Sequence, residues 1–118
     1  MSEAYDLYQE GRSRLRSGMS AQATVPLERA KSLQPEKASI REALGIAYFR
    51  IRRFVEAERE FRALIELSPT DHYAHYALGR TLEQQGRDVE ANAHYKLARS
   101  MDPSSSHYSR EARSRLGA

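Results

Sequence analysis

Apolar residues recur along this chain with the three- and four-residue spacing of amphipathic α-helices. Two consecutive segments show this most clearly, with four apolar residues on one face of each: Leu44, Ala47, Tyr48 and Ile51, then Ala57, Phe61, Leu64 and Ile65. No strand signal competes with this pattern. It predicts seven helices, near residues 3–16, 20–33, 37–50, 54–67, 71–84, 88–101 and 105–117.

A repeat of about 34 residues underlies these helices. Five sets of similar residues recur at one constant interval: Gly11, Gly45 and Gly79; Ala23, Ala57 and Ala91; Leu27, Phe61 and Tyr95; Ala30, Leu64 and Ala98; and Pro35, Pro69 and Pro103. Five sets in one register indicate stacked repeats rather than chance.

Each set predicts a packing role. A glycine inside a helix costs about 1 kcal/mol relative to alanine, so its repetition predicts the close approach of a neighbouring helix backbone. The large residue four positions after each alanine lies on the same helical face, and we expect it to fill the space between hairpins. Proline cannot continue a helix and therefore ends each repeat.

Turn signals divide each repeat into two helices. The first repeat has Gly18 at this point and the third has Gly86, whereas the second has Arg52. A non-glycine residue there either carries a small cost of left-handed backbone or is tolerated. Pro26 falls inside the second predicted helix and removes a backbone donor, so we expect a slight bend or a late start of that helix.

These residues resemble the tetratricopeptide repeat (TPR) family. The second and third repeats follow the family's order of small and large residues: Leu44-Gly45, Tyr48, Ala57, Phe61 and Pro69, then Leu78-Gly79, Leu82, Ala91, Tyr95, Ala98 and Pro103. The first repeat departs from that order at Glu10 and Arg14. The family's frequent Trp is replaced by Leu7, Arg41 and His75, and the resemblance covers about residues 4–103.

The resemblance implies an all-α fold, a right-handed α-solenoid of three helix-turn-helix repeats followed by a capping helix. We expect a single domain over residues 1–118, with repeats at about 4–37, 38–71 and 72–105 and a capping helix at about 105–117. Ser104, Ser105 and Ser106 offer N-cap hydroxyls to that helix. Arg113 stands where the register requires glycine, which predicts a polar outer face and a complete small solenoid.

In the family, the first helix of each hairpin lines the concave surface, which implies a binding groove on this chain. Its residues would be Tyr5, Tyr8, Arg12, Leu15 and Arg16, then Ser39, Glu42, Ile46, Phe49 and Arg50, then Tyr73, Tyr76, Arg80, Glu83 and Gln84. Tyr and Arg are the side chains that most often anchor interfaces. The groove therefore predicts an extended partner with acidic side chains or a free carboxylate, unless some tyrosines only pack between helices.

One specialisation of the family does not fit. The clamp that grips the acidic C-termini of cytosolic heat-shock chaperones needs Lys and Asn in the first helix, Asn in the third, and Lys and Arg in the fifth. The corresponding positions hold Tyr8, Arg12, Ala43, Tyr73 and Ala77. The chain is therefore not expected to be that kind of co-chaperone.

Signals for catalysis or cofactor binding are weak. The chain has no cysteine, which excludes disulfides, thiolate metal sites and cysteine nucleophiles. It has no glycine-rich phosphate loop and no nucleophile elbow. His72 and His75 have a spacing that two metal ligands on a helix can use, but no carboxylate motif completes a site. We therefore expect surface or packing histidines, no metal, no cofactor, no small-molecule substrate and no enzymatic activity.

Charge and targeting signals narrow the picture only a little. The net charge is +3, and 16 of the 19 basic residues are Arg. Such a mild charge does not by itself indicate a nucleic-acid binder. The N-terminal residues lack the basic and apolar regions of a signal peptide, and no apolar run approaches the roughly 18 residues of a membrane span. The expected compartment is the cytoplasm.

Three functions are compatible with the sequence. The leading one is a non-enzymatic adaptor or scaffold that binds a peptide segment or partner protein in the groove. The second is a self-assembling structural scaffold, a homo-oligomer in which one copy's terminal helix fills another's groove. The third is electrostatic attachment to nucleic acid, which the mild net charge disfavours.

Overall fold

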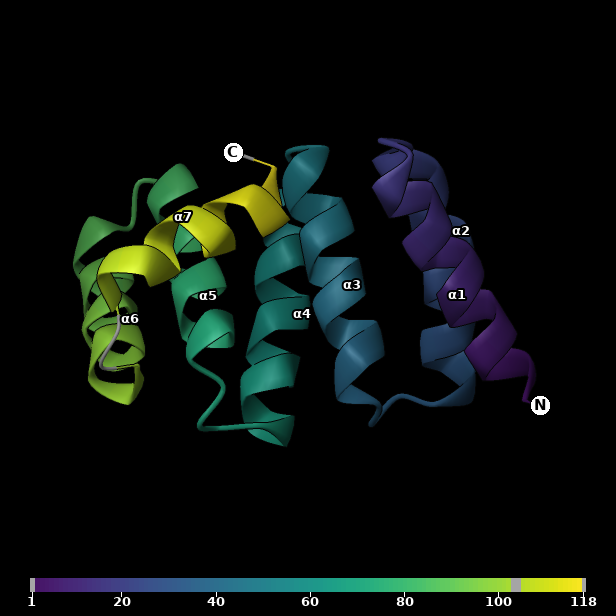
Figure 1. Cartoon of the computed structure of the whole chain (residues 1–118), viewed down its shortest axis with the longest axis horizontal. Coiled ribbons are helices and arrows are strands. Elements are labelled where there is room, and N and C mark those ends of the chain that lie inside the picture. Colours follow the sequence, from purple (N-terminus) through teal and green to yellow (C-terminus); the bar gives the residue numbers. More distant parts are fainter. Residues whose placement is uncertain (1, 103–104, 118) are drawn as a thin grey trace.

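The computed structural model describes residues 2–102 and 105–117, and the side chains of these except 105–109 and 111. The described residues form seven α-helices and no strand: α1 (Glu3–Arg16), α2 (Ser20–Leu33), α3 (Ala38–Arg50), α4 (Phe54–Leu67), α5 (His72–Gln84), α6 (Asp88–Met101) and α7 (Ser105–Leu116). The first six pair as three hairpins that stand side by side along a body of 38 × 24 × 24 Å (Figure 1). This is the predicted α-solenoid. None of the described helices is both long and apolar enough to cross a membrane.

Two helices, α3 and α5, begin one residue later than predicted, and a side-chain cap explains the start of α5. The Asp71 carboxylate accepts a hydrogen bond from the backbone N–H of Ala74 at 3.2 Å, so Asp71 is the N-cap of α5. Lys37 holds the equivalent position before α3, but its side chain makes no capping hydrogen bond. The prediction that Ser104–Ser106 cap α7 concerns side chains outside the described ones, and Pro103 also lies outside the described residues.

The repeated glycines make room for a large side chain from the second helix of the same hairpin. A Cβ added to Gly45 would lie 2.5 Å from Cε1 of Phe61. The same pairing recurs one repeat earlier and one repeat later, between Gly11 and Leu27 and between Gly79 and Tyr95. The prediction of a close backbone approach is therefore wrong in detail, because a side chain fills the space. It also does so within a hairpin rather than between hairpins.

The turn inside each hairpin requires one residue with left-handed backbone. Gly18 and Gly86 both have φ of 76°, and Arg52 at the equivalent position has φ of 64°. This conformation costs a non-glycine residue roughly 1–2 kcal/mol. The Arg52 guanidinium lies 5.2 Å from the ring centroid of Phe54, and this cation–π contact offsets part of the cost. Of the two alternatives that the sequence allowed for this turn, the structure shows the left-handed backbone at Arg52.

Pro26 lies inside α2 without delaying the start of that helix. Because proline has no N–H, the carbonyl of Gln22, four residues earlier, loses its helical hydrogen bond. The side chain of Arg14 replaces the missing donor, with Nη1 donating to Gln22 O at 2.9 Å. Arg14 stands where the other repeats have Tyr48 and Leu82. Pro26 and Arg14 both depart from the family pattern, and Arg14 supplies the hydrogen-bond donor that Pro26 removes.

Arg41 and Glu60 of the second hairpin form an ion pair, whereas two histidines stand at the same positions of the third hairpin. Arg41 donates from Nη1 to Glu60 Oε1 at 3.0 Å and from Nε to the carbonyl of the preceding proline at 3.0 Å. His75 and His94 hold these positions in the next repeat, with their Nδ1 atoms 3.2 Å apart and His75 Nε2 3.1 Å from the carbonyl of its own preceding proline. If His75 donates from Nε2, as Arg41 does from Nε, its Nδ1 accepts a hydrogen bond from His94.

His94 is expected to make the stability of the fold depend on pH. Burial, followed by the neighbouring His75 and Arg62, lowers the pKa of His94 below its ordinary 6.5, and Glu90 opposes the shift. The unfolded chain therefore binds the proton more tightly than the folded chain does. The free energy of unfolding is therefore highest at a pH above the His94 pKa of the unfolded chain. It decreases as the pH falls from that value to the lower His94 pKa of the folded chain. Urea denaturation across this pH window measures the effect, and His94→Gln should remove it. An unchanged pH profile in that variant would contradict the assignment.

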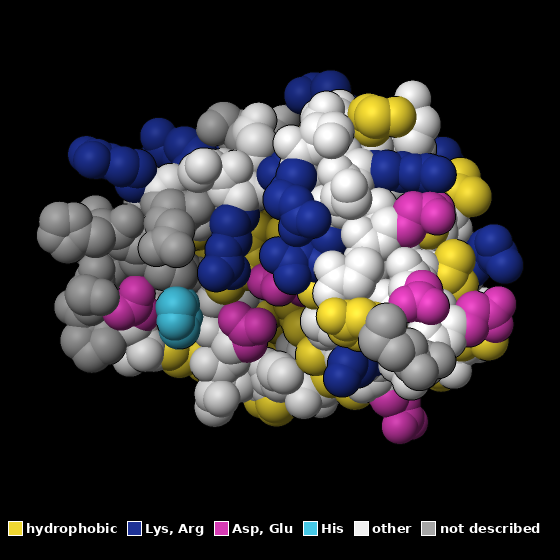
Figure 2. Space-filling model, turned by 45° about the vertical axis from the view of Figure 1, so that its right-hand side comes forward, with side chains coloured by type: hydrophobic (Ala, Val, Ile, Leu, Met, Phe, Trp, Pro, Cys, Tyr) yellow, Lys and Arg dark blue, Asp and Glu magenta, His cyan; other side chains and the backbone are white. Residues whose placement is uncertain are grey.

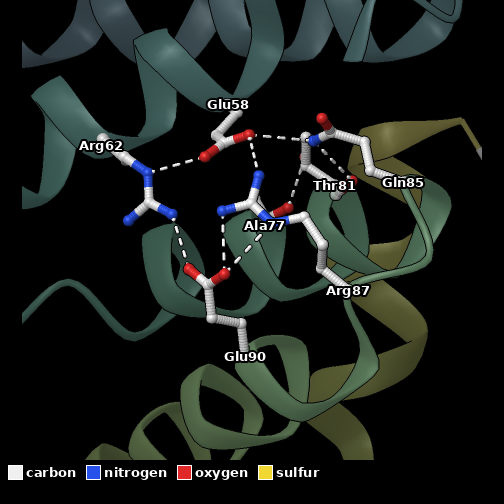
Figure 3. A network of polar contacts seen from close by, with 7 residues as sticks. All are labelled: Glu58, Arg62, Ala77, Thr81, Gln85, Arg87 and Glu90. Carbon is white, nitrogen blue, oxygen red and sulfur yellow. Dashed lines mark hydrogen bonds and ion pairs between the residues drawn. The ribbon is translucent and has the colours of Figure 1, made fainter. Parts of the chain in front are cut away.

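A polar network joins the second hairpin to the third (Figure 3). Arg62 donates to Glu58 and to Glu90, each at 2.9 Å, and Arg87 donates to the same two carboxylates at 2.9 and 2.8 Å. Gln85 Nε2 adds a hydrogen bond to Glu58 at 3.0 Å. Exposed ion pairs are individually weak. Here, however, Glu58 and Arg62 of α4 share partners with Arg87 and Glu90 at the start of α6, so the network links the two hairpins.

The last helix, α7, does not continue the stack as the first helix of a fourth repeat. It runs across the face made by α3 and α5 and packs against both (Figure 1). Ala112 and Leu116 are 2% and 0% exposed and join an apolar cluster that contains Phe49, Tyr73 and Tyr76. The predicted capping helix therefore covers part of the face formed by α1, α3 and α5, which is called the inner face below.

Candidate functional site

The inner face has an open half and a covered half. The open half holds a pocket of about 410 Å³ between α1 and α3, which Arg115 of α7 borders. It is lined by Tyr8, Arg12, Leu15, Arg16, Ser39, Glu42, Ala43, Ile46, Arg50 and Arg115. Figure 2 shows Lys and Arg side chains gathered near the middle of the molecule, with acidic and hydrophobic side chains among them. Four of the ten residues that line the pocket are arginines, so it is basic.

Two of these arginines are available to a partner. Arg12 and Arg16 are exposed, and neither forms an ion pair with any described residue. The Arg12 guanidinium lies 5.7 Å from the ring centroid of Tyr8, so a cation and an aromatic ring share one side of the pocket. Arginine presents a planar fork that matches a carboxylate in two parallel hydrogen bonds. This side of the pocket can therefore hold an acidic group.

Arg50 has a structural role instead. Its Nη1 donates to the carbonyl of Leu15 at 3.1 Å, and its Nη2 donates to the carbonyl of Arg115 at 2.7 Å. Its Nε is buried and has no hydrogen-bond partner among the described residues. One side chain thus ties the C-terminal end of α1 and the last turn of α7 to α3. Arg50 lines the pocket, but two of its donors are already engaged.

Glu42 supplies the negative charge of the pocket. Its Oε1 accepts from Arg115 Nη1 at 3.3 Å. Burial raises the pKa of Glu42 above its ordinary value, although Arg115 and Arg12 oppose that shift. An acidic partner in this pocket would meet Arg12, Arg16 and Arg115 together with this carboxylate. Glu42 therefore limits how far into the pocket a second carboxylate can reach.

Tyr5 extends the open half toward the beginning of α1. Its side chain is 48% exposed. Tyr5 and Tyr8 border a second hollow of about 240 Å³, together with Lys37 and Ile40 from the start of α3. The two hollows share Tyr8 and Ser39, so they form one continuous open surface between α1 and α3.

The covered half holds three of the predicted groove residues. Phe49, Tyr73 and Tyr76 are only 6%, 4% and 8% exposed. Arg115 of α7 places its guanidinium 4.6 Å from the ring centroid of Tyr73. The prediction that these rings face a partner is therefore corrected for the folded chain. Tyr73 lies under Arg115 of α7, whereas the ring centroids of Phe49 and Tyr76 lie 5.3 Å from Phe54 and 5.8 Å from Tyr95. The alternative interpretation, in which some tyrosines only pack between helices, describes this half.

Arg80 and Glu83 of α5 are also committed within the chain. Arg80 Nη1 donates to the Tyr76 hydroxyl at 3.0 Å, and its Nε lies 3.6 Å from Glu83 Oε1. Glu83 also accepts from the Tyr95 hydroxyl at 3.1 Å. Burial, together with Glu83, raises the pKa of Tyr95. Tyr5, Tyr8 and Arg12 of α1 and Tyr73, Tyr76 and Arg80 of α5 share one Tyr-x-x-Tyr-x-x-x-Arg spacing. This set borders the open half on α1, whereas its side chains on α5 contact other residues of the chain.

A family model for the tetratricopeptide repeat matches residues 8–72 and again residues 42–106. The chain belongs to the tetratricopeptide repeat family. The two overlapping matches are offset by one repeat, as successive members of the glycine and alanine sets are. The fold and the family therefore rest on the same repeated residues.

Solved structures of other TPR proteins have the same fold. A mutant of MamA is 26% identical, with a TM-score of 0.82 over 86% of this chain and 74% of that one. YrrB, described as a TPR protein with an unusual peptide-binding site, is 22% identical, with a TM-score of 0.83 over 88% of this chain and 54% of its own. The second TPR of Spaghetti (RPAP3), bound to the HSP90 peptide SRMEEVD, is 19% identical, with a TM-score of 0.81 over 86% and 94%. A search of curated protein sequences finds no significant match.

Two charged residues of this TPR pocket region were not predicted as site residues. Arg115 reaches the pocket from α7, and Lys37 borders the second hollow from the turn before α3. The register of the repeats could not indicate Arg115, because α7 does not follow their stacking geometry. The available signal was the spacing of Ala112 and Leu116, two apolar residues four apart on a mostly polar helix.

Proposed function

We propose that this TPR protein is a non-enzymatic interaction module that holds an acidic or carboxylate-bearing peptide in the open half of its inner face. The observation that carries the proposal is the pair Arg12 and Arg16, exposed on one pocket beside Tyr8 and without ion-pair partners among the described residues. Unpaired arginines beside an aromatic ring are a common anchor for a peptide carboxylate.

Related structures support a peptide as the ligand. The second TPR of Spaghetti (RPAP3) is bound to the HSP90 peptide SRMEEVD, and YrrB is described as having an unusual peptide-binding site. The present chain lacks the residues of the chaperone clamp: Tyr8 and Ala43 stand at two of those positions in the open half, and Tyr73 lies buried beneath α7. An acidic peptide would therefore bind through Arg12 and Arg16 in an arrangement different from that clamp. Self-assembly and nucleic-acid attachment stay predictions.

Charge reversal at these two positions tests the proposal. Arg12→Glu together with Arg16→Glu is expected to weaken binding of a fluorescein-labelled Glu-rich octapeptide with a free carboxylate by at least about 100-fold, because each charge-assisted contact contributes about 1.5–3 kcal/mol. Fluorescence anisotropy measures the affinity, and circular dichroism confirms the fold.

A matched double variant separates the effect of where the charge is reversed from the effect of the change in net charge. Arg59→Glu with Arg99→Glu makes the same change in net charge at exposed positions of α4 and α6. Its affinity for the octapeptide should stay near that of the native chain. Equal affinities in the two double variants would remove the open pocket as the binding site.

A further inference from the structure

The covered half of the inner face is occupied by a segment of the chain itself, and that segment is an amphipathic helix with a narrow apolar edge. Ala112 and Leu116 are the buried residues among its described side chains, whereas Arg110, Arg113, Ser114 and Arg115 are exposed. Two apolar side chains four positions apart lie on one face of a helix and enter the same groove.

The surface under α7 is built mainly by α3 and α5. Phe49 packs edge-on against Phe54, with ring centroids 5.3 Å apart, and Arg80 lies 6.0 Å from the Phe49 ring centroid. Arg80 in turn donates to the Tyr76 hydroxyl. These contacts hold Phe49 and Tyr76 in place from within the stack, and none of them involves a residue of α7. This part of the floor is therefore preformed for a helix that carries matching apolar residues.

Three polar contacts orient the helix on that floor. Arg50 donates to the carbonyl of Arg115 at 2.7 Å, in the last turn of α7, where helical carbonyls have no intrahelical partner. Arg115 itself lies over the ring of Tyr73 and donates to Glu42. Arg50 thus binds the C-terminal end of the helix. Tyr73 and Glu42 bind one cationic side chain of that helix.

We propose that the covered half is a second binding site, specific for an amphipathic helical segment of a partner protein that replaces α7. The segment has a small residue and a Leu four positions apart on one face, and an Arg directly before the Leu, as Ala112, Arg115 and Leu116 are arranged here. This is recognition of a helix in a groove. It goes beyond the acidic-peptide site and does not depend on that site binding anything. It rests on Phe49, Tyr73 and Tyr76 rather than on Arg12 and Arg16, although Glu42 and Arg50 border both surfaces.

The tethered α7 competes with any such partner. A segment joined to its own groove acts at a high effective concentration, so a free helix binds the native chain more weakly than it binds an emptied groove. Weakening α7 should therefore expose the site. Arg115→Glu is suited to this purpose because the side chain is 48% exposed and the substitution places a carboxylate beside Glu42 and over Tyr73. Leu116→Asp removes the buried apolar contact instead.

The experiment uses a fluorescein-labelled peptide with the sequence of residues 105–117, added to the full native chain, to Arg115→Glu and to Leu116→Asp. Anisotropy is expected to show at least tenfold tighter binding to both variants than to the native chain. Arg113→Glu is the matched control, an equal charge change on an exposed residue of the same helix, and should bind as the native chain does. A peptide carrying Leu116→Asp should not bind any of them.

Hydrogen exchange gives an independent readout in the native chain. Excess peptide should speed exchange of the α7 amides and leave α1 to α6 unchanged, because only α7 is displaced. Equal peptide affinity for the native chain and both variants would overturn the proposal. So would a concentration-dependent dimer in light scattering without peptide binding, because a second copy would then be the occupant. The Arg12→Glu/Arg16→Glu variant should still bind the helical peptide, so failure of one site is distinguishable from failure of the other.

Discussion

A chain carrying Phe61→Ala is expected to lose about 4 kcal/mol of unfolding free energy, a large part of the stability of a small domain. Phe61 is 0% exposed and fills the space that Gly45 leaves between α3 and α4. Removing the ring deletes its apolar contacts and leaves a cavity in a rigid hairpin, where the surrounding helices relax only partly.

Gly45→Ala perturbs the same contact from the other helix. The added Cβ would lie 2.5 Å from Cε1 and 2.7 Å from Cδ1 of Phe61, so the ring or the helix must move. Alanine gains about 1 kcal/mol of helix propensity over glycine, but overpacking costs about 1–3 kcal/mol. We expect a net loss of about 1 kcal/mol or more for this single substitution.

The double variant tests whether the two residues form one packing unit. Gly45→Ala in the Phe61→Ala background should cost nothing further or even restore some stability, because the ring that the new Cβ would meet is gone. Gly79→Ala in the Phe61→Ala background is the matched control and should be additive, since Gly79 packs on Tyr95 instead. Urea denaturation of the single and double variants gives the coupling energy. Additive costs for Gly45 and Phe61 would refute the pairing.

The helices of this fold could be predicted from sequence because each repeat restates the same local rules. The proline and the apolar spacing recur in every repeat, and the turn glycine recurs in the first and third, so the helix ends were predicted to within one residue. The partner of each glycine could not be predicted in the same way. Spacing places Gly45 and Phe61 on their helices, but it does not say whether a backbone or a ring fills the gap between them.

The candidate site was predictable only where the repeat geometry continues. Tyr8 and Arg12 follow from the helical period of α1 and the family pattern, and the structure places them on the open pocket. Tyr73 and Tyr76 satisfy the same period on α5, yet α7 covers them. Periodicity assigns a residue to a face of its helix. It does not say what else lies on that face. The path of α7 depends on tertiary contacts that have no equivalent in the other repeats.

The ion pairs of Glu60 show how equivalent positions diverge in chemistry, and they support the second prediction with a large effect. The Glu60 side chain is 3% exposed and accepts from Lys31 Nζ at 2.9 Å and from Arg41 Nη1 at 3.0 Å. The equivalent residues are Pro26 in the first hairpin and His94 in the third. Glu60→Ala should lower the free energy of unfolding by about 3 kcal/mol, because it strands the charge of the largely buried Arg41.

Removing the stranded charge should recover part of that loss. Lys31 keeps a second partner, Glu28, at 3.0 Å, so Arg41 is the side chain left without an ion pair in Glu60→Ala. Adding Arg41→Leu, which copies the apolar residue of the first hairpin at this position, is expected to make the double variant more stable than Glu60→Ala alone. Glu66→Ala, an exposed site on the same helix, should change stability little. If thermal and urea denaturation instead show that the two losses add, the cost of Glu60→Ala lies in lost packing rather than in the unpaired guanidinium.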